Sequence, residues 1–265
     1  MRKTLGLMVV WLGSVSLAQA HFTMLLPSMP ATKKGEEVTF TYQWGHPYEH
    51  QLFDAPRPNK VVVLEPDPTR VAAAPKVIDL TTNVHKAERT GAEGKPVTVW
   101  QFRFTPRERG DYVFLLTTAP LFLKEANYFV QDTVKVVLHV QVQQGWDVAL
   151  PDAMQLLPLT RPYGLEPNMV VQARLPEAKN ADFLVDFERY NATPPKELPP
   201  DEQVTRTAKM DPNGIVTGTL TDPGWWALTA RRGTANDSLF FEGKARPLQK
   251  RAILWLFVDA KPASK

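Results

Sequence analysis

The stretch Tyr128-Phe129-Val130-Gln131-Asp132-Thr133-Val134-Lys135-Val136-Val137-Leu138-His139-Val140-Gln141-Val142 carries the longest alternating pattern in the chain. Val134, Val136, Leu138 and Val140 occupy every second position, which is the period of a β-strand that buries one face. The same alternation places His139 on the opposite face. The pattern predicts a long β-strand.

Similar runs lie on both sides of this stretch and alternate or are rich in β-branched residues. They cover residues 37–42, 60–64, 97–104 and 110–116 before it, and 169–175, 183–190, 203–209, 215–220, 225–231 and 253–258 after it. Turn sequences such as Asp211-Pro212-Asn213-Gly214 separate them. No segment has the pattern of a helix of three turns. Short strands joined by such turns predict an all-β fold of the β-sandwich type.

The strands fall into two blocks. The first ends near Gly145-Trp146-Asp147, and four prolines between residues 151 and 167 then interrupt any regular strand. We expect an N-terminal β domain over residues 21–147 and a C-terminal β-sandwich over residues 148–265. Within the first block, residues 83–96 are polar and lack an apolar face, so this segment is predicted to be a mobile loop.

The first 20 residues have the pattern of a secretory signal peptide. Met1-Arg2-Lys3 is a short basic segment, residues 5–17 form an apolar run broken only by small residues, and Ala18-Gln19-Ala20 has the small-x-small form of a cleavage site. The apolar run is too short for a comfortable transmembrane helix, which needs about 20 residues. We therefore expect residues 1–20 to be removed and the mature protein to be exported and soluble, with His21 as its first residue.

Composition narrows the range of partners. Loss of Arg2 and Lys3 reduces 31 basic residues to 29, against 28 acidic ones, so the mature chain is nearly neutral. No basic tract suggests nucleic acid or an anionic membrane. The chain contains no cysteine, so burial rather than disulfides must stabilise it. Sequence motifs for a phosphate loop or a serine-nucleophile elbow are also absent, and we expect no enzyme activity.

The candidate metal ligands are His21, His46, Glu49 and His50. Three of these are histidines within the first 30 residues of the predicted mature chain, and His46 and His50 flank Pro47-Tyr48-Glu49 in a loop after the first strand. A terminal histidine offers both its α-amine and its imidazole to one ion and closes a chelate ring. Imidazole ligands suit late first-row divalent metals, with affinity favouring copper and nickel.

The predicted site takes two nitrogen ligands from His21 and a third from His46, with Glu49 or His50 completing it or lying next to it. The alternative is that His46 and His50 are solvated loop residues and that His21 is only a tolerated first residue. His85 lies in the polar segment 83–96 and is predicted to be a surface histidine. His139 is predicted to be a packing or hydrogen-bonding residue.

Several motifs occur together in order: Ala20-His21-Phe22 with Pro27-Ser28, His46-Pro47-Tyr48-Glu49, residues 158–165, Asp211-Pro212-Asn213-Gly214 with Pro223-Gly224-Trp225-Trp226, and residues 254–257. This pattern resembles an exported family, formerly a domain of unknown function, assigned as the periplasmic component of nickel or cobalt uptake systems of the energy-coupling-factor type. The resemblance covers nearly the whole mature chain.

The resemblance implies a periplasmic protein that binds Ni²⁺, or alternatively Co²⁺, and serves a membrane-embedded transporter component. It also implies a transthyretin-like or carboxypeptidase-regulatory-like second domain, and it carries over only His21 and the His46-Pro47-Tyr48-Glu49 motif as metal positions. His50 lies outside that motif. Two other functions use the same donors: a Cu²⁺ chaperone or resistance protein, and a terminal-histidine copper oxygenase. A structural sandwich that binds a partner protein and no metal is a further alternative.

Overall fold

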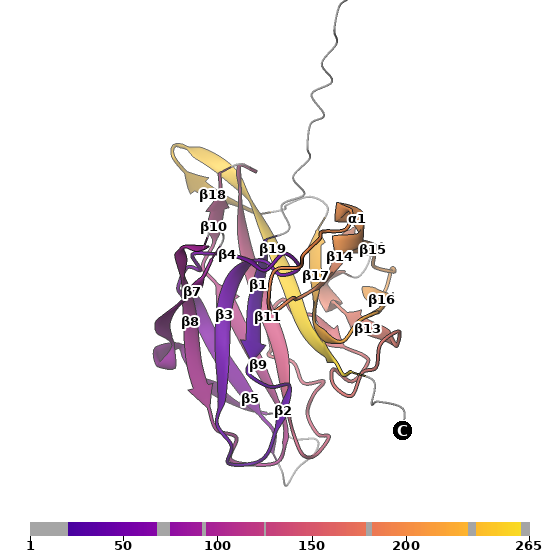
Figure 1. The fold of residues 1–265 in the computed structure, drawn as a ribbon. Helices are drawn as coiled ribbons and strands as arrows, with labels where there is room; N and C mark the ends of the chain where they lie inside the picture. Colours follow the sequence, from indigo (N-terminus) through magenta and orange to yellow (C-terminus); the bar gives the residue numbers. More distant parts are fainter. Residues whose placement is uncertain are drawn as a thin grey trace, which may run out of the picture.

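The computed structural model describes residues 21–67, 75–91, 94–124, 126–178, 182–232 and 237–260 (Figure 1). The predicted signal peptide lies outside the described residues. The all-β sandwich prediction is confirmed: strands dominate the described part of the chain and form three sheets. The few helical segments there are single turns, namely η1 (Thr81–Asn83), η3 (Pro176–Ala178) and α1 (Asp201–Val204).

The first block is a sandwich of two sheets. Its outer sheet has the order β1-β3-β8-β7, with β4 paired to β3. Its strands are β1 (Phe22–Pro27), β3 (Val38–His46), β4 (Gln51–Phe53), β7 (His85–Thr90) and β8 (Pro96–Phe104). Alternate residues of this sheet, among them Phe40 and Phe102, pack against Phe114 and Val136 of the facing sheet.

The facing sheet is the largest in the molecule and runs through both blocks, in the order β15-β14-β17-β19-β11-β9-β5-β6. In the first block it contains β5 (Pro58–Glu65), β6 (Lys76–Asp79), β9 (Gly110–Thr118) and β11 (Tyr128–Val140), with the short strands β2 (Ala31–Thr32) and β10 (Leu121–Leu123) attached to β11. The long alternating stretch of the sequence is β11, as predicted.

The same sheet continues in the second block with β14 (Phe183–Arg189), β15 (Thr205–Lys209), β17 (Gly224–Arg232), β18 (Asp237–Phe241) and β19 (Lys244–Val258). A smaller sheet covers it, made of β12 (Leu157–Pro158), β13 (Val170–Arg174) and β16 (Ile215–Thr219). Between these two layers lies a second hydrophobic core.

Strand β19 joins the two blocks. It pairs antiparallel with β17 and parallel with β11, where Val134 faces Ile253 in the register. Because neighbouring side chains of a strand point to opposite faces, Ile253 and Trp255 enter the first core while Leu254 and Leu256 enter the second. The largest sheet therefore continues across the boundary expected near residue 147, and its long yellow strand in Figure 1 borders both cores.

Two local findings complete the fold. Within the segment predicted to be a loop from its polarity, His85–Thr90 instead form β7, which pairs with β8 at the sheet edge through its backbone and needs no apolar face. The segment after β11 covers the outer face of β5, β9 and β11, where Trp146, Val148 and Tyr163 pack against a third hydrophobic cluster.

Candidate metal site

The pairing of β1 with β3 brings His21 and His46 together. Phe22 lies opposite Gly45 in this antiparallel ladder, so the next position of the register places His21 opposite His46. Their ring centroids are 4.4 Å apart and their planes are tilted by 40°. Both side chains are half-buried. Two residues 25 positions apart in sequence thus become neighbours by strand pairing alone.

Aromatic side chains surround this histidine pair. The ring of His21 stacks on Trp44, with centroids 4.5 Å apart and an interplanar angle of 8°. Phe53 of β4 lies 5.3 Å from His21 and 5.7 Å from His46 between ring centroids. Trp44 lies two positions before His46 and therefore on the same face of β3. These ring contacts restrict the positions of the two imidazoles.

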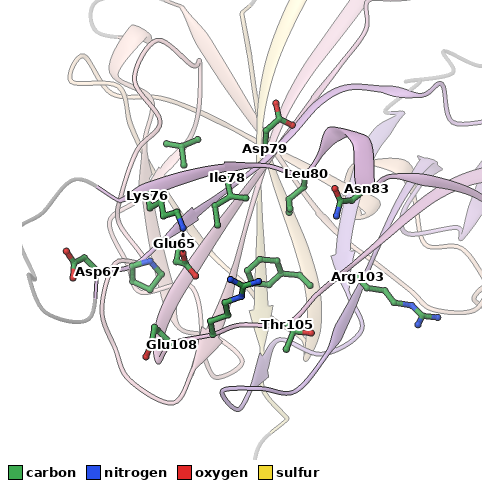
Figure 2. Close-up of a pocket in the computed structure, with 14 residues that line it drawn as sticks. Glu65, Asp67, Lys76, Ile78, Asp79, Leu80, Asn83, Arg103, Thr105 and Glu108 are labelled. Carbon is green, nitrogen blue, oxygen red and sulfur yellow. Dashed lines mark ion pairs between the residues drawn. The ribbon is translucent and has the colours of Figure 1, made fainter.

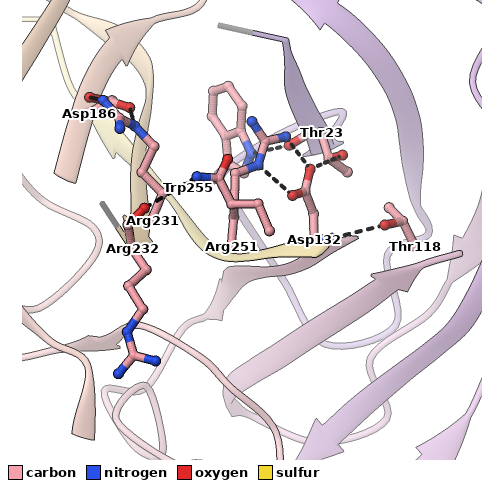
Figure 3. A network of polar contacts seen from close by, with 9 residues as sticks. Thr23, Thr118, Asp132, Asp186, Arg231, Arg232, Arg251 and Trp255 are labelled. Carbon is pink, nitrogen blue, oxygen red and sulfur yellow. Dashed lines mark hydrogen bonds and ion pairs between the residues drawn. The ribbon is translucent and has the colours of Figure 1, made fainter. Parts of the chain in front are cut away.

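A buried ion pair holds β1 next to this site (Figure 3). Arg251 of β19 donates two hydrogen bonds of 2.7 Å to Asp132 of β11, and both residues are almost completely buried. Thr23 donates its hydroxyl to the same Asp132 carboxylate at 2.7 Å, and Trp255 donates its indole N–H to the Thr23 carbonyl. Residue 23 is two positions from His21, so this network limits fraying of the strand that carries His21.

The turn after His46 is tight and depends on glycine. Gly45 has φ +150°, and a Cβ atom there would lie 2.0 Å from the Gln51 carbonyl oxygen, which no side chain could accommodate. His50 adopts φ +53°, a left-handed conformation that is uncommon for residues other than glycine. The chain therefore reverses direction within the His46–His50 segment and continues directly into β4.

His50 and Glu49 are directed to the second block. The Nδ1 atom of His50 lies 2.8 Å from the Asn191 carbonyl oxygen. Glu49 lies near Glu188 of β14, whose carboxylate accepts hydrogen bonds from the Tyr48 N–H and the Thr205 hydroxyl. Burial raises the pKa of Glu188 to about 8, and the charge of Glu49 contributes in the same direction. One oxygen of Glu49 is buried without a hydrogen-bond partner.

Of the four predicted ligands, the structure thus brings His21 and His46 into contact and engages His50 elsewhere. Within the described residues, no group of three or more His, Cys, Asp or Glu side chains is placed to hold a metal ion. The predicted site takes one of its three nitrogens from the main chain of His21.

The other histidines lie apart from this pair. His85 is exposed on β7. His139 of β11 contacts the fully buried carboxylate of Asp111 at 2.7 Å and stacks on Tyr163 with centroids 4.1 Å apart. The Asp111 carboxylate also accepts the Tyr163 hydroxyl at 2.8 Å, so His139 has the packing and hydrogen-bonding contacts expected of it.

A model of the family DUF4198, described as a domain of unknown function, matches residues 18–234. The chain belongs to the DUF4198 family. No curated protein matches the sequence.

Solved structures resemble this DUF4198 chain only weakly. A Salmonella alpha-2-macroglobulin reacted with methylamine is 11% identical, with a TM-score of 0.22, and the match covers 90% of this chain and 15% of that one. An ICAM-5 D1–D4 ectodomain fragment is 14% identical, with a TM-score of 0.22, and the match covers 92% of this chain and 52% of that one. Similarity at these TM-scores carries no argument about function.

The histidine pair fits a nitrogen-ligated metal ion by distance. Metal–nitrogen bonds are about 2.0–2.1 Å long, so two imidazoles bound to one ion have ring centroids within about 6.5 Å of each other. The separation of 4.4 Å between His21 and His46 satisfies this condition.

In this DUF4198 chain, Trp44 could have been assigned to the site from its spacing to His46, whereas nothing in the sequence pattern marked Asn191 or Glu188.

A groove of about 920 Å³ lies elsewhere, between β6 and the segment after β8 (Figure 2). Glu65, Lys76, Asp79, Arg103 and Glu108 are among its lining residues, and Lys76 forms an ion pair with Glu65 at 3.6 Å. None of the predicted metal ligands lines this groove.

No helix in the described ranges is long and apolar enough to cross a membrane.

Proposed function

We propose that this protein is an exported, non-catalytic binder of a late first-row divalent metal ion. The observation that carries the proposal is the contact between His21 and His46, whose ring centroids are 4.4 Å apart at paired positions of β1 and β3. Two imidazoles from rigid strands, held by Trp44 and Phe53, form a preorganised pair of nitrogen donors. Metals that prefer such donors are nickel, copper, cobalt and zinc.

Signal-peptide cleavage before His21 would create the third donor. The new α-amine belongs to the same residue as the first imidazole, so both can bind one ion in a chelate ring. An α-amine has a pKa of about 7.7–8.0 and must lose its proton to bind a metal. Metal affinity should therefore fall as the pH falls below this range, and an uncleaved chain should lack the amine donor altogether.

We propose Ni²⁺, or alternatively Co²⁺, as the cargo and a membrane-embedded transporter component as its recipient. The choice of metal and recipient rests on the motif resemblance to nickel and cobalt uptake components. Affinity alone cannot identify the cargo, because Cu²⁺ binds almost any set of nitrogen donors more tightly than Ni²⁺. Uptake of radioactive nickel by cells with and without the gene measures the cargo directly; unchanged uptake would contradict the nickel assignment.

Calorimetry on two forms of the protein tests the site. One form begins at His21 and the other retains Ala20, so they differ by one residue that blocks the α-amine of His21. We expect the first form to bind Ni²⁺, Co²⁺, Cu²⁺ and Zn²⁺ with one ion per chain, and the second to bind at least tenfold more weakly. Equal binding by the two forms would exclude the terminal amine as a ligand.

A copper assay tests the alternative that the same donors form the copper site of a terminal-histidine oxygenase. Copper-loaded protein beginning at His21 is incubated with a reductant, dioxygen and polysaccharide substrates, and the products are analysed for oxidised sugars. We expect none. Oxidised products that depend on His46 would replace the carrier function with a terminal-histidine copper oxygenase.

A further inference from the structure

Asn191 lies in the second block, directly after β14 and Tyr190, yet its polar groups contact the His46–His50 segment of the first block. Its backbone N–H donates to the Pro47 carbonyl oxygen at 3.0 Å. Its side-chain Nδ2 donates to the Tyr48 carbonyl oxygen at 2.7 Å. Its own carbonyl oxygen lies 2.8 Å from His50 Nδ1. A single residue of the second block thus contacts three residues of the His46–His50 segment.

The loop needs such outside partners. Pro47 has no N–H, and the left-handed His50 prevents the segment from continuing as a regular strand. Half-buried carbonyl groups without partners would cost free energy, so the contacts to Pro47 and Tyr48 stabilise this conformation. The remaining Tyr48 N–H donates to Glu188 at 3.2 Å, also from the second block. The backbone of the loop is therefore fixed from across the block boundary.

The contact with His50 also determines which ring nitrogen carries hydrogen. A carbonyl oxygen can only accept a hydrogen bond, so the Nδ1 atom of His50 must be the donor. In the neutral imidazole the lone pair then belongs to Nε2. Metal-binding histidines in proteins usually have this arrangement, with one nitrogen donating to a carbonyl or carboxylate and the other free to ligate.

We infer that Asn191 is a positioning residue of the candidate metal site: it fixes the backbone of the loop that begins at His46 and holds His50 in its Nδ1–H form. This inference rests on the proposed metal-binding function. Its consequence is that the site is not complete within the first block. The second block preorganises it, and removal of the Asn191 contacts weakens metal binding without removing a ligand.

Two substitutions of Asn191 test the inference in the full chain beginning at His21. N191A removes the donor to Tyr48, and N191D keeps the side-chain size but places an acceptor against the Tyr48 carbonyl. We expect each to weaken Ni²⁺ binding about tenfold and to accelerate Ni²⁺ dissociation, with little change in melting temperature. N213A is the matched control, since Asn213 lies in the turn before β16, and it should bind Ni²⁺ within twofold of the unsubstituted protein.

Nitrogen-15 NMR of the His50 ring supplies a measurement on the metal-free, unsubstituted protein. We expect the Nδ1–H tautomer in that protein and also in N191A, because the Asn191 oxygen that accepts from His50 belongs to the main chain. Nickel affinities of N191A and N191D within twofold of the unsubstituted protein would overturn the inference, and so would an Nε2–H tautomer in the unsubstituted protein. If the unsubstituted protein binds none of the four metals, the proposed function fails, while the NMR measurement still decides whether Asn191 fixes the loop.

Discussion

His21 and His46 differ from the other histidines of the chain in how they are held. His21 directly precedes β1 and His46 is the last residue of β3, and each contacts the ring of Phe53. His50 is held instead by a backbone carbonyl of the second block. At the scale of single residues, the candidate site is therefore a pair of imidazoles in a rigid aromatic environment, followed by a third imidazole on a constrained turn.

Substitution of His46 should remove one metal ligand and leave the fold intact. We expect H46A to lower Ni²⁺ affinity by about 100-fold at neutral pH, because one of the two imidazoles in the contacting pair is lost. H85A is the control, since His85 is exposed on β7. Calorimetry measures both, and a similar loss of affinity in the two variants would contradict the assignment of His46.

Lys135 provides a pH-dependent prediction. Its ammonium group is fully buried beneath the segment after β11, and its Nζ donates to the Val148 carbonyl at 3.0 Å. Burial lowers the pKa of Lys135 from 10.5 to about 7. Between these two values the unfolded chain binds a proton that the folded chain does not, so this group makes the free energy of unfolding rise as the pH increases from about 7 to about 10.

The variant K135M should remove this dependence. We expect it to be more stable than the unsubstituted protein at pH 7, with the difference shrinking toward pH 10, because methionine requires no desolvation of a charge. Chemical denaturation at several pH values gives the two curves. Parallel curves over this range would show that Lys135 does not lose its proton in the folded state.

At the scale of elements, β1 depends on a polar network in the interior of the first sandwich. Most of the strand is apolar, but Thr23 reaches Asp132, and Asp132 is paired with Arg251 of β19. The network links β1 to β11 and β19, and its contacts from Thr23 join residues that are 109 and 232 positions apart in the sequence. This network and the β1–β3 ladder together fix the position and the register of β1.

Substitution of Thr23 by valine tests this anchor. T23V keeps the shape of the side chain and removes one hydrogen bond to a buried carboxylate, so we expect a loss of about 1–3 kcal/mol in the free energy of unfolding. T90V, at an exposed position of β7, should change it by less than about 0.5 kcal/mol. Urea denaturation measures both, and equal effects would argue against a role of the network in holding β1.

At the scale of the whole molecule, the shared strand β19 couples the two cores. Ile253 and Trp255 fill the first core, while Leu254 and Leu256 fill the second. The candidate site also depends on both blocks, because Asn191 and Glu188 of the second block hold the loop after His46. The two blocks are therefore expected to fold as one cooperative unit.

Calorimetric unfolding should show this coupling. We expect a single transition for the mature chain, and we expect a fragment of residues 21–147 to remain unfolded, since it lacks the β19 partner of β11 and the side chain of Trp255. Two separate transitions, or a fragment with a well-dispersed NMR spectrum, would instead support two independent domains as predicted from the proline-rich boundary.

The amino-acid sequence by itself determined the strand class, the strand at residues 128–140 and the candidate ligands His21 and His46, because alternation and residue chemistry are local properties. The backbone-paired edge strand β7, the common strand β19 and the contacts of Asn191 were decided only by the tertiary structure. These features depend on hydrogen bonds between segments far apart in the chain. At least one partner in each of these bonds is a main-chain group, which residues of any type carry, so the bonds leave little mark in the order of side chains.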